Sequence, residues 1–148
     1  MAIISLEQAQ ADLVPFTTSS SVRCYFVTRS NLPIYKPKAN GERATIDEVS
    51  DPAFLEKASE NTRDIYQGIL WEVERRQAPV IEVYEVEGTR EMRVVIGYKQ
   101  GGTNHYFSSL SDLYHFYGLY STRKYVEQFS NGITVICESP VLLPCFSV

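Results

Sequence analysis

The pattern of apolar and polar positions predicts a short helix and a strand in the first part of the chain. Residues 5–14 carry apolar side chains at helical spacing, with Ser5 as a cap and Pro15 ending the helix. Residues 22–29 alternate between apolar and polar positions, which predicts a strand with one apolar face. Prolines and Asn40-Gly41 then indicate a loop over residues 30–45.

A long helix is predicted from Asp51 to about Arg76. Asp51 can cap the helix, and the proline that follows it suits the first helical turn. The apolar face of this segment has a polar gap at Glu60–Arg63, so we expect a break there.

Three strands joined by short turns are predicted after this helix. They cover Val80–Glu87, Glu91–Lys99 and Thr103–Ser108. If Gly88-Thr89 forms the two-residue turn of a hairpin, Glu87 pairs with Arg90, and this pair sets the register of the first two strands. One face of the hairpin is then largely apolar and needs a cover, and it consists of Ile81, Val83, Glu85, Met92, Val94, Ile96 and Tyr98. The opposite face carries Glu82, Tyr84, Arg93 and Gly97.

Residues 104–125 hold both histidines and many aromatic side chains. Leu110, Leu113, Tyr114 and Tyr117 recur at helical spacing after Ser109, which predicts a core helix that Gly118 can divide. Asn131-Gly132 then marks a turn, and alternation over residues 133–137 predicts a last strand. Together these elements predict an α+β domain with helices packed against an antiparallel sheet.

Size and charge narrow the classes of partner. A chain of 148 residues suits one domain, 1–148, with a real core. The net charge is −4 and the basic residues are scattered, so no nucleic acid partner is expected. No apolar run approaches the roughly 18 residues needed to span a bilayer, so no membrane association is expected either.

The spacing of cysteines and glycines argues against a bound group. Cys24, Cys137 and Cys145 are odd in number and widely spaced, which favours free thiols in a reducing, cytoplasmic compartment. Neither a metal-ligand spacing nor a glycine-rich phosphate loop is present in the sequence. We therefore expect no metal and no cofactor.

Several short segments are similar to one known family. They are the first-helix segment 5–13, Phe26-Val-Thr-Arg29, the Phe, Ser-Leu, Leu, Tyr spacing of residues 107–117, and Leu-Leu-Pro-Cys at 142–145. Outside about 32–77, this order of elements resembles the Src homology 2 domain. The resemblance implies a central antiparallel sheet flanked by two helices. The loop and long helix at about 32–77 would be an insertion between the first and second core strands, as in bacterial effector members.

The resemblance implies a phosphotyrosine-peptide binding module without catalytic activity. Its partners would be tyrosine-phosphorylated proteins, in a host cytoplasm if the chain is an effector. Arg29 would anchor the phosphate, Ser30 and Asn31 would donate hydrogen bonds, and Arg93 would be a second cation. A shifted alignment makes Arg23 the pocket arginine. A guanidinium fits these roles because it can hold two phosphate oxygens in a fork.

Two other functions stay open at this point. Glu82, Arg93 and His105 fall on three successive predicted strands, where they could act as base, phosphate clamp and acid of a metal-independent ribonuclease. The ribonuclease hypothesis depends on the pairing register of the third strand, because the register decides which face of the sheet carries His105. The second alternative is a protein-interaction module without a pocket. His115 is interpreted as a packed or rim residue of the aromatic helix.

Overall fold

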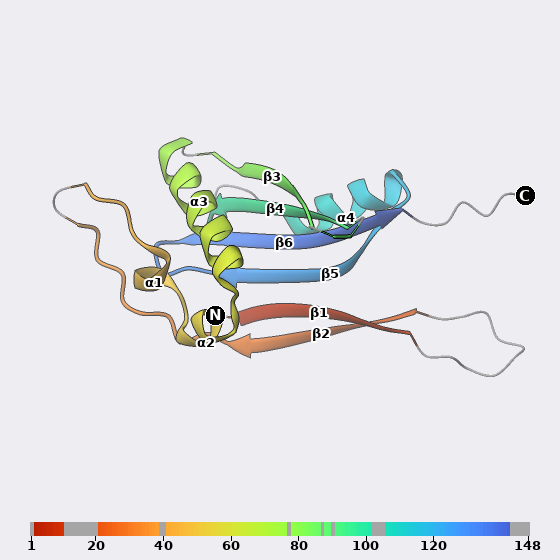
Figure 1. The fold of residues 1–148 in the computed structure, drawn as a ribbon, viewed down its shortest axis with the longest axis horizontal. Coiled ribbons are helices and arrows are strands. Elements are labelled where there is room, and N and C mark those ends of the chain that lie inside the picture. Colours follow the sequence, from red (N-terminus) through yellow and green to blue (C-terminus); the bar gives the residue numbers. More distant parts are fainter. Residues whose placement is uncertain are drawn as a thin grey trace, which may run out of the picture.

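The computed structural model describes residues 2–10, 21–38, 41–76, 78–86, 88–89, 91–101 and 106–142. Six strands form one sheet in the order β2-β1-β5-β6-β4-β3, and every neighbouring pair is antiparallel (Figure 1). The strands are β1 (Ala2–Gln10), β2 (Ser21–Arg29), β3 (Val80–Glu85), β4 (Met92–Lys99), β5 (Leu119–Gln128) and β6 (Ile133–Leu142). The helices are α1 (Ile46–Val49), α2 (Pro52–Lys57), α3 (Glu60–Arg76) and α4 (Tyr106–Phe116).

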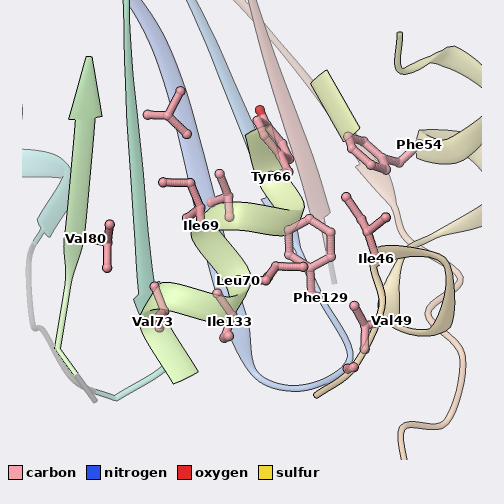
Figure 2. Packing of buried hydrophobic residues seen from close by; sticks show 13 residues of the cluster. Ile46, Val49, Phe54, Tyr66, Ile69, Leu70, Val73, Val80, Phe129 and Ile133 are labelled. Carbon is pink, nitrogen blue, oxygen red and sulfur yellow. The ribbon is translucent and has the colours of Figure 1, made fainter. Parts of the chain in front are cut away.

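The main core lies between the sheet and α3. The helix crosses in front of the strands in Figure 1 and buries a stripe of side chains at helical spacing. The stripe consists of Tyr66, Ile69, Leu70 and Val73. It packs against buried sheet residues such as Val80, Val95 and Val135, and against Phe129 after β5 (Figure 2). The aromatic ring of Phe54 in α2 stacks on Tyr66 with 5.6 Å between ring centroids.

The close approach of α3 to the sheet depends on Gly97 in β4. A Cβ atom at Gly97 would lie 2.3 Å from Cγ2 of Ile69 and 2.9 Å from Cγ2 of Val73. Both distances are shorter than real carbon contacts, so a side chain at this position would push the helix away from the sheet. Glycine is therefore the residue that lets α3 pack here.

The second core lies on the other face of the sheet. Ile96, Val126 and Ile136 are buried there, and Leu110 of α4 packs against them. Side chains alternate between the two faces of a strand, so Val95 faces α3 and its neighbour Ile96 faces α4. Helix α3 thus packs on one face of the sheet and α4 on the other.

The structure confirms several predicted elements. β2 covers the predicted strand, and β3 and β4 pair with Val83 opposite Val94, which is the register predicted from a two-residue turn. The predicted long helix starts at Asp51, whose side chain accepts a hydrogen bond from the Ala53 amide. Its break lies at Ala58 and Ser59, slightly before the predicted gap. The strand after Asn131-Gly132 is β6.

Two helix predictions were wrong, because sheet pairing overrides local helical spacing. Residues 5–10 belong to β1, which pairs with β2 on one side and β5 on the other, while residues 11–14 lie outside the described part. Residues 119–125 are strand β5, since Gly118 adopts φ 63° and ends α4. Conversely, residues 106–108 begin α4 instead of ending a strand.

The prediction that the apolar face of the hairpin is covered is confirmed only for β4, where Ile96 is buried in the core beside α4. α3 packs on the face of Val80, Tyr84 and Gly97, whereas Ile81 and Val83 on the other face of β3 are exposed. The α+β class holds, but the Src homology 2 arrangement does not. The first segment is a strand, and the helix predicted as an insertion supplies the main core.

Candidate functional site

The arginines predicted to bind phosphate lie on different parts of the sheet. Arg29 is exposed at the end of β2, and Arg93 lies on β4 opposite Tyr84. Three strands separate β2 from β4, which amounts to about 19 Å at the usual strand spacing. Arg23 pairs with Gln8 on β1, also far from β4. The structure therefore does not bring these cations together around one phosphate group.

The predicted hydrogen-bond donors already serve another purpose. The backbone N–H of Asn31 donates to the carboxylate of Asp51, which also caps α2 through a 2.7 Å bond from the Ala53 amide. Ser30 beside it is half-buried. The Asn31 amide is therefore already engaged by a carboxylate, whose negative charge repels anions. The contact instead ties the loop after β2 to α2.

Of the predicted ribonuclease residues, Glu82 and Arg93 lie on the same face of the neighbouring strands β3 and β4. The carboxylate of Glu82 accepts a hydrogen bond from the Tyr84 hydroxyl, and burial together with this bond raises the pKa of Tyr84 to about 12. His105 lies outside the described residues, and His115 is exposed on α4. Within the described residues, no group of three or more histidine, cysteine or acidic side chains could hold a metal ion.

A polar group lies in the core under α3. Burial raises the pKa of the Tyr66 hydroxyl, which forms a hydrogen bond with the Cys137 thiol. Burial also raises the pKa of Cys137, although the nearby charge of Arg93 acts in the opposite direction. Both groups therefore stay protonated at neutral pH, and the thiol is a weak nucleophile.

A second polar group lies where α2 meets β5. Burial raises the pKa of Glu127 from its ordinary value of 4.5 to about 7. The charge of Asp51 raises it further, and Lys57 acts in the opposite direction. The carboxyl of Glu127 thus changes its charge near neutral pH.

The face covered by α4 holds a buried ion pair. Nζ of Lys124 lies 2.6 Å from Oε1 of Glu138, and the two residues are directly opposite each other on β5 and β6. The Glu138 side chain is fully buried. Sequence reasoning missed this pair because it placed Lys124 in a helix. Once β5 is assigned as a strand, Lys124 lies two residues before the buried Val126, and Glu138 lies two residues after the buried Ile136, so all four face the same side of the sheet. This alternation is the sequence signal that could have revealed the pair.

Exposed apolar side chains form a further feature of the same face. Ile81 is 62% exposed, Val83 53% and Met92 46%. Leu113 and Phe116 of α4 are also exposed. Among the helices of the described part, none is long and apolar enough to cross a membrane.

Comparison with known proteins gives the family. The family model described as NAD-specific glutamate dehydrogenase, second domain, matches residues 7–139. The chain belongs to this family. It is 45% identical over 119 residues to the NAD-specific glutamate dehydrogenase of Neurospora crassa, and 45% identical over 123 residues to the probable NAD-specific glutamate dehydrogenase of Schizosaccharomyces pombe. Glutamate dehydrogenase 2 of Dictyostelium discoideum is 39% identical over 125 residues.

The chain corresponds to a small part of these relatives. The alignments cover 80%, 81% and 77% of this chain, and 11%, 11% and 12% of the respective relatives. No solved structure matches the chain. The second-domain match begins in β1 and ends in β6, so it includes all four helices of the described part.

Family membership corrects the functional predictions. The Src homology 2 resemblance was wrong, and so were the phosphotyrosine function, the phosphorylated partners and the signalling effector role. The ribonuclease alternative was wrong as well. The expectation that the protein is not an enzyme also fails, because the relatives are named as dehydrogenases. The motifs behind the resemblance were short, and the first of them, predicted as a helix, begins in strand β1.

Proposed function

We propose that this chain serves as the second domain of a NAD-specific glutamate dehydrogenase polypeptide. The observation that carries the proposal is the family match over residues 7–139, which spans the whole sheet from β1 to β6. Two fungal relatives with this name are 45% identical to the chain, which supports the same activity for the polypeptide to which it belongs.

Within that enzyme, we propose that the domain contributes by folding and packing. Two pairs of titratable groups in its interior are engaged with one another: Tyr66 with Cys137, and Lys124 with Glu138. Such pairs are well placed to fix the sheet and its helices. The dehydrogenation of glutamate with NAD belongs, in this proposal, to the assembled polypeptide.

A domain graft tests the proposal. Residues 7–139 of this chain replace the matching segment of the Neurospora crassa relative, and NADH formation is measured with glutamate as the substrate. We expect the graft to retain the activity, because the replaced segment and the chain are 45% identical. A graft with an unrelated α+β domain of similar length gives the background rate.

Two variants of the graft separate a folding defect from a functional one. Gly68→Ala should leave the activity intact, since a Cβ at Gly68 meets nothing within 4 Å. Gly97→Val should abolish it, because the side chain would clash with Ile69 and Val73. A graft that is folded by circular dichroism, yet has only the background rate, would contradict the proposal.

A further inference from the structure

The outer hairpin of the sheet carries apolar side chains on both faces, but α3 covers only one of these faces. Val80 is 2% exposed under α3, whereas its neighbour Ile81 is 62% exposed on the other face. The register places Val83 opposite Val94 and Glu85 opposite Met92, so Ile81, Val83 and Met92 lie on one face. We name these three residues the hairpin patch.

The position of the hairpin patch explains why its side chains remain exposed. β3 is the last strand of the sheet, at the upper edge in Figure 1. α4 lies on the same side of the sheet, but the buried residues that it helps to cover belong to β4, β5 and β6. Its own Phe116 is 80% exposed and its Leu113 is 50% exposed. On this side of the sheet, exposed apolar side chains thus come from both the hairpin and α4.

The choice of residues on β3 indicates that this surface is normally covered. An antiparallel strand with one solvated face alternates between apolar and polar side chains, and a strand buried on both faces has a continuous apolar character. β3 carries isoleucine and valine at two of its three outward positions and Glu85 at the third. Apolar side chains that gather on one exposed face commonly mark a contact with another protein surface.

We propose that the hairpin patch docks against another region of the same dehydrogenase polypeptide. This inference rests on the proposed function. Roughly nine-tenths of each fungal relative lies outside the matched segment, on the same covalent chain. Covalent linkage gives such a region a high effective concentration at the patch, which favours it over a separate partner.

The charge beside the hairpin patch indicates what the docked surface is like. Glu85 is exposed on the same face as the patch, opposite Met92. The docked surface is therefore aliphatic or aromatic at its centre and carries lysine or arginine where it meets the Glu85 carboxylate.

Thiol labelling tests whether the patch is covered. Val83→Cys is introduced into the isolated chain and into the Neurospora crassa graft, and the rate of maleimide labelling at this position is measured by peptide mass mapping. Ile34→Cys is the matched control, because Ile34 is 89% exposed and lies outside the patch. If the docked state holds about nine in ten molecules, Val83→Cys labels about tenfold more slowly in the graft. Ile34→Cys should label at the same rate in both.

The other outcomes would overturn the inference. Equal labelling of Val83→Cys in the isolated chain and in an active graft would show that the patch is open in the enzyme, while the proposed function stands. Protection in the isolated chain that grows with protein concentration would identify a second copy as the occupant. A folded graft without glutamate-dependent activity would instead contradict the proposed function, and the docking inference that rests on it would be overturned with it.

Discussion

The contact between Gly97 and α3 gives the sharpest prediction of stability. The methyl group of Gly97→Ala would lie 2.3 Å from Cγ2 of Ile69 and 2.9 Å from Cγ2 of Val73. Ile69 and Val73 are fully buried, so neither can swing aside into solvent. Overpacking of this kind costs about 1–3 kcal/mol of unfolding free energy. For a chain of this size, that corresponds to a melting temperature lower by roughly 3–10 °C.

Gly68→Ala is the matched control for this substitution. Gly68 lies in α3 with open space around it, and alanine is a better helix former than glycine. The control should therefore raise the unfolding free energy by about 0.5–1 kcal/mol. The same chemical change at two glycines is thus expected to shift stability in opposite directions.

Thermal and urea unfolding, followed by circular dichroism, measure both variants. A third variant, Ile69→Ala, removes the methyl group that Gly97→Ala would strike. In a protein that already carries Ile69→Ala, Gly97→Ala should lower the unfolding free energy by at least about 1 kcal/mol less than it does in the original protein. A Gly97→Ala protein as stable as the original, or an equal cost in both backgrounds, would refute the packing of α3 on β4.

Two further predictions concern buried charges. Lys124→Ala leaves the Glu138 carboxylate buried without its 2.6 Å partner and should cost about 3–5 kcal/mol in urea unfolding, whereas replacing both residues by methionine should recover most of this. A double variant no more stable than Lys124→Ala would contradict this account of the pair. Folding raises the pKa of Glu127 from 4.5 to about 7, so its ionisation should reduce stability as the pH rises through that window. Glu127→Gln should remove this part of the pH dependence, and an unchanged pH profile would contradict it.

Elements with strong local signals could be predicted from the sequence. Asp51-Pro52 specified the start of α2, because a capping carboxylate and a proline in the first turn are both local features. The two-residue turn at Gly88-Thr89 fixed the pairing of Val83 with Val94, since the length of a turn sets the hairpin register.

Elements that depend on distant partners were not predictable in this way. β1 shows helical spacing, but it is a strand because β2 and β5 pair with its backbone on both sides. The packing of α3 on the hairpin depends on Gly97, whose missing side chain lets the helix approach, and periodicity alone did not predict this contact. The Lys124–Glu138 pair required knowing that β5 is a strand beside β6.

The functional prediction failed for a related reason. Short matches such as the one ending at Arg29 were combined into a phosphate pocket before the strand order was known. In the sheet, Arg29 and Arg93 are separated by three strands, so the two side chains are not placed to bind the same phosphate group. The family match over residues 7–139 carries more weight, because it covers the whole fold.

The most direct test of the central claim is the initial rate of glutamate-dependent NADH formation by the Neurospora crassa dehydrogenase carrying residues 7–139 of this chain. If the chain is a second domain of this enzyme, the rate should lie within about tenfold of the unmodified enzyme, equivalent to about 1.4 kcal/mol in activation free energy. A folded graft whose rate equals that of the unrelated-domain control would contradict the claim.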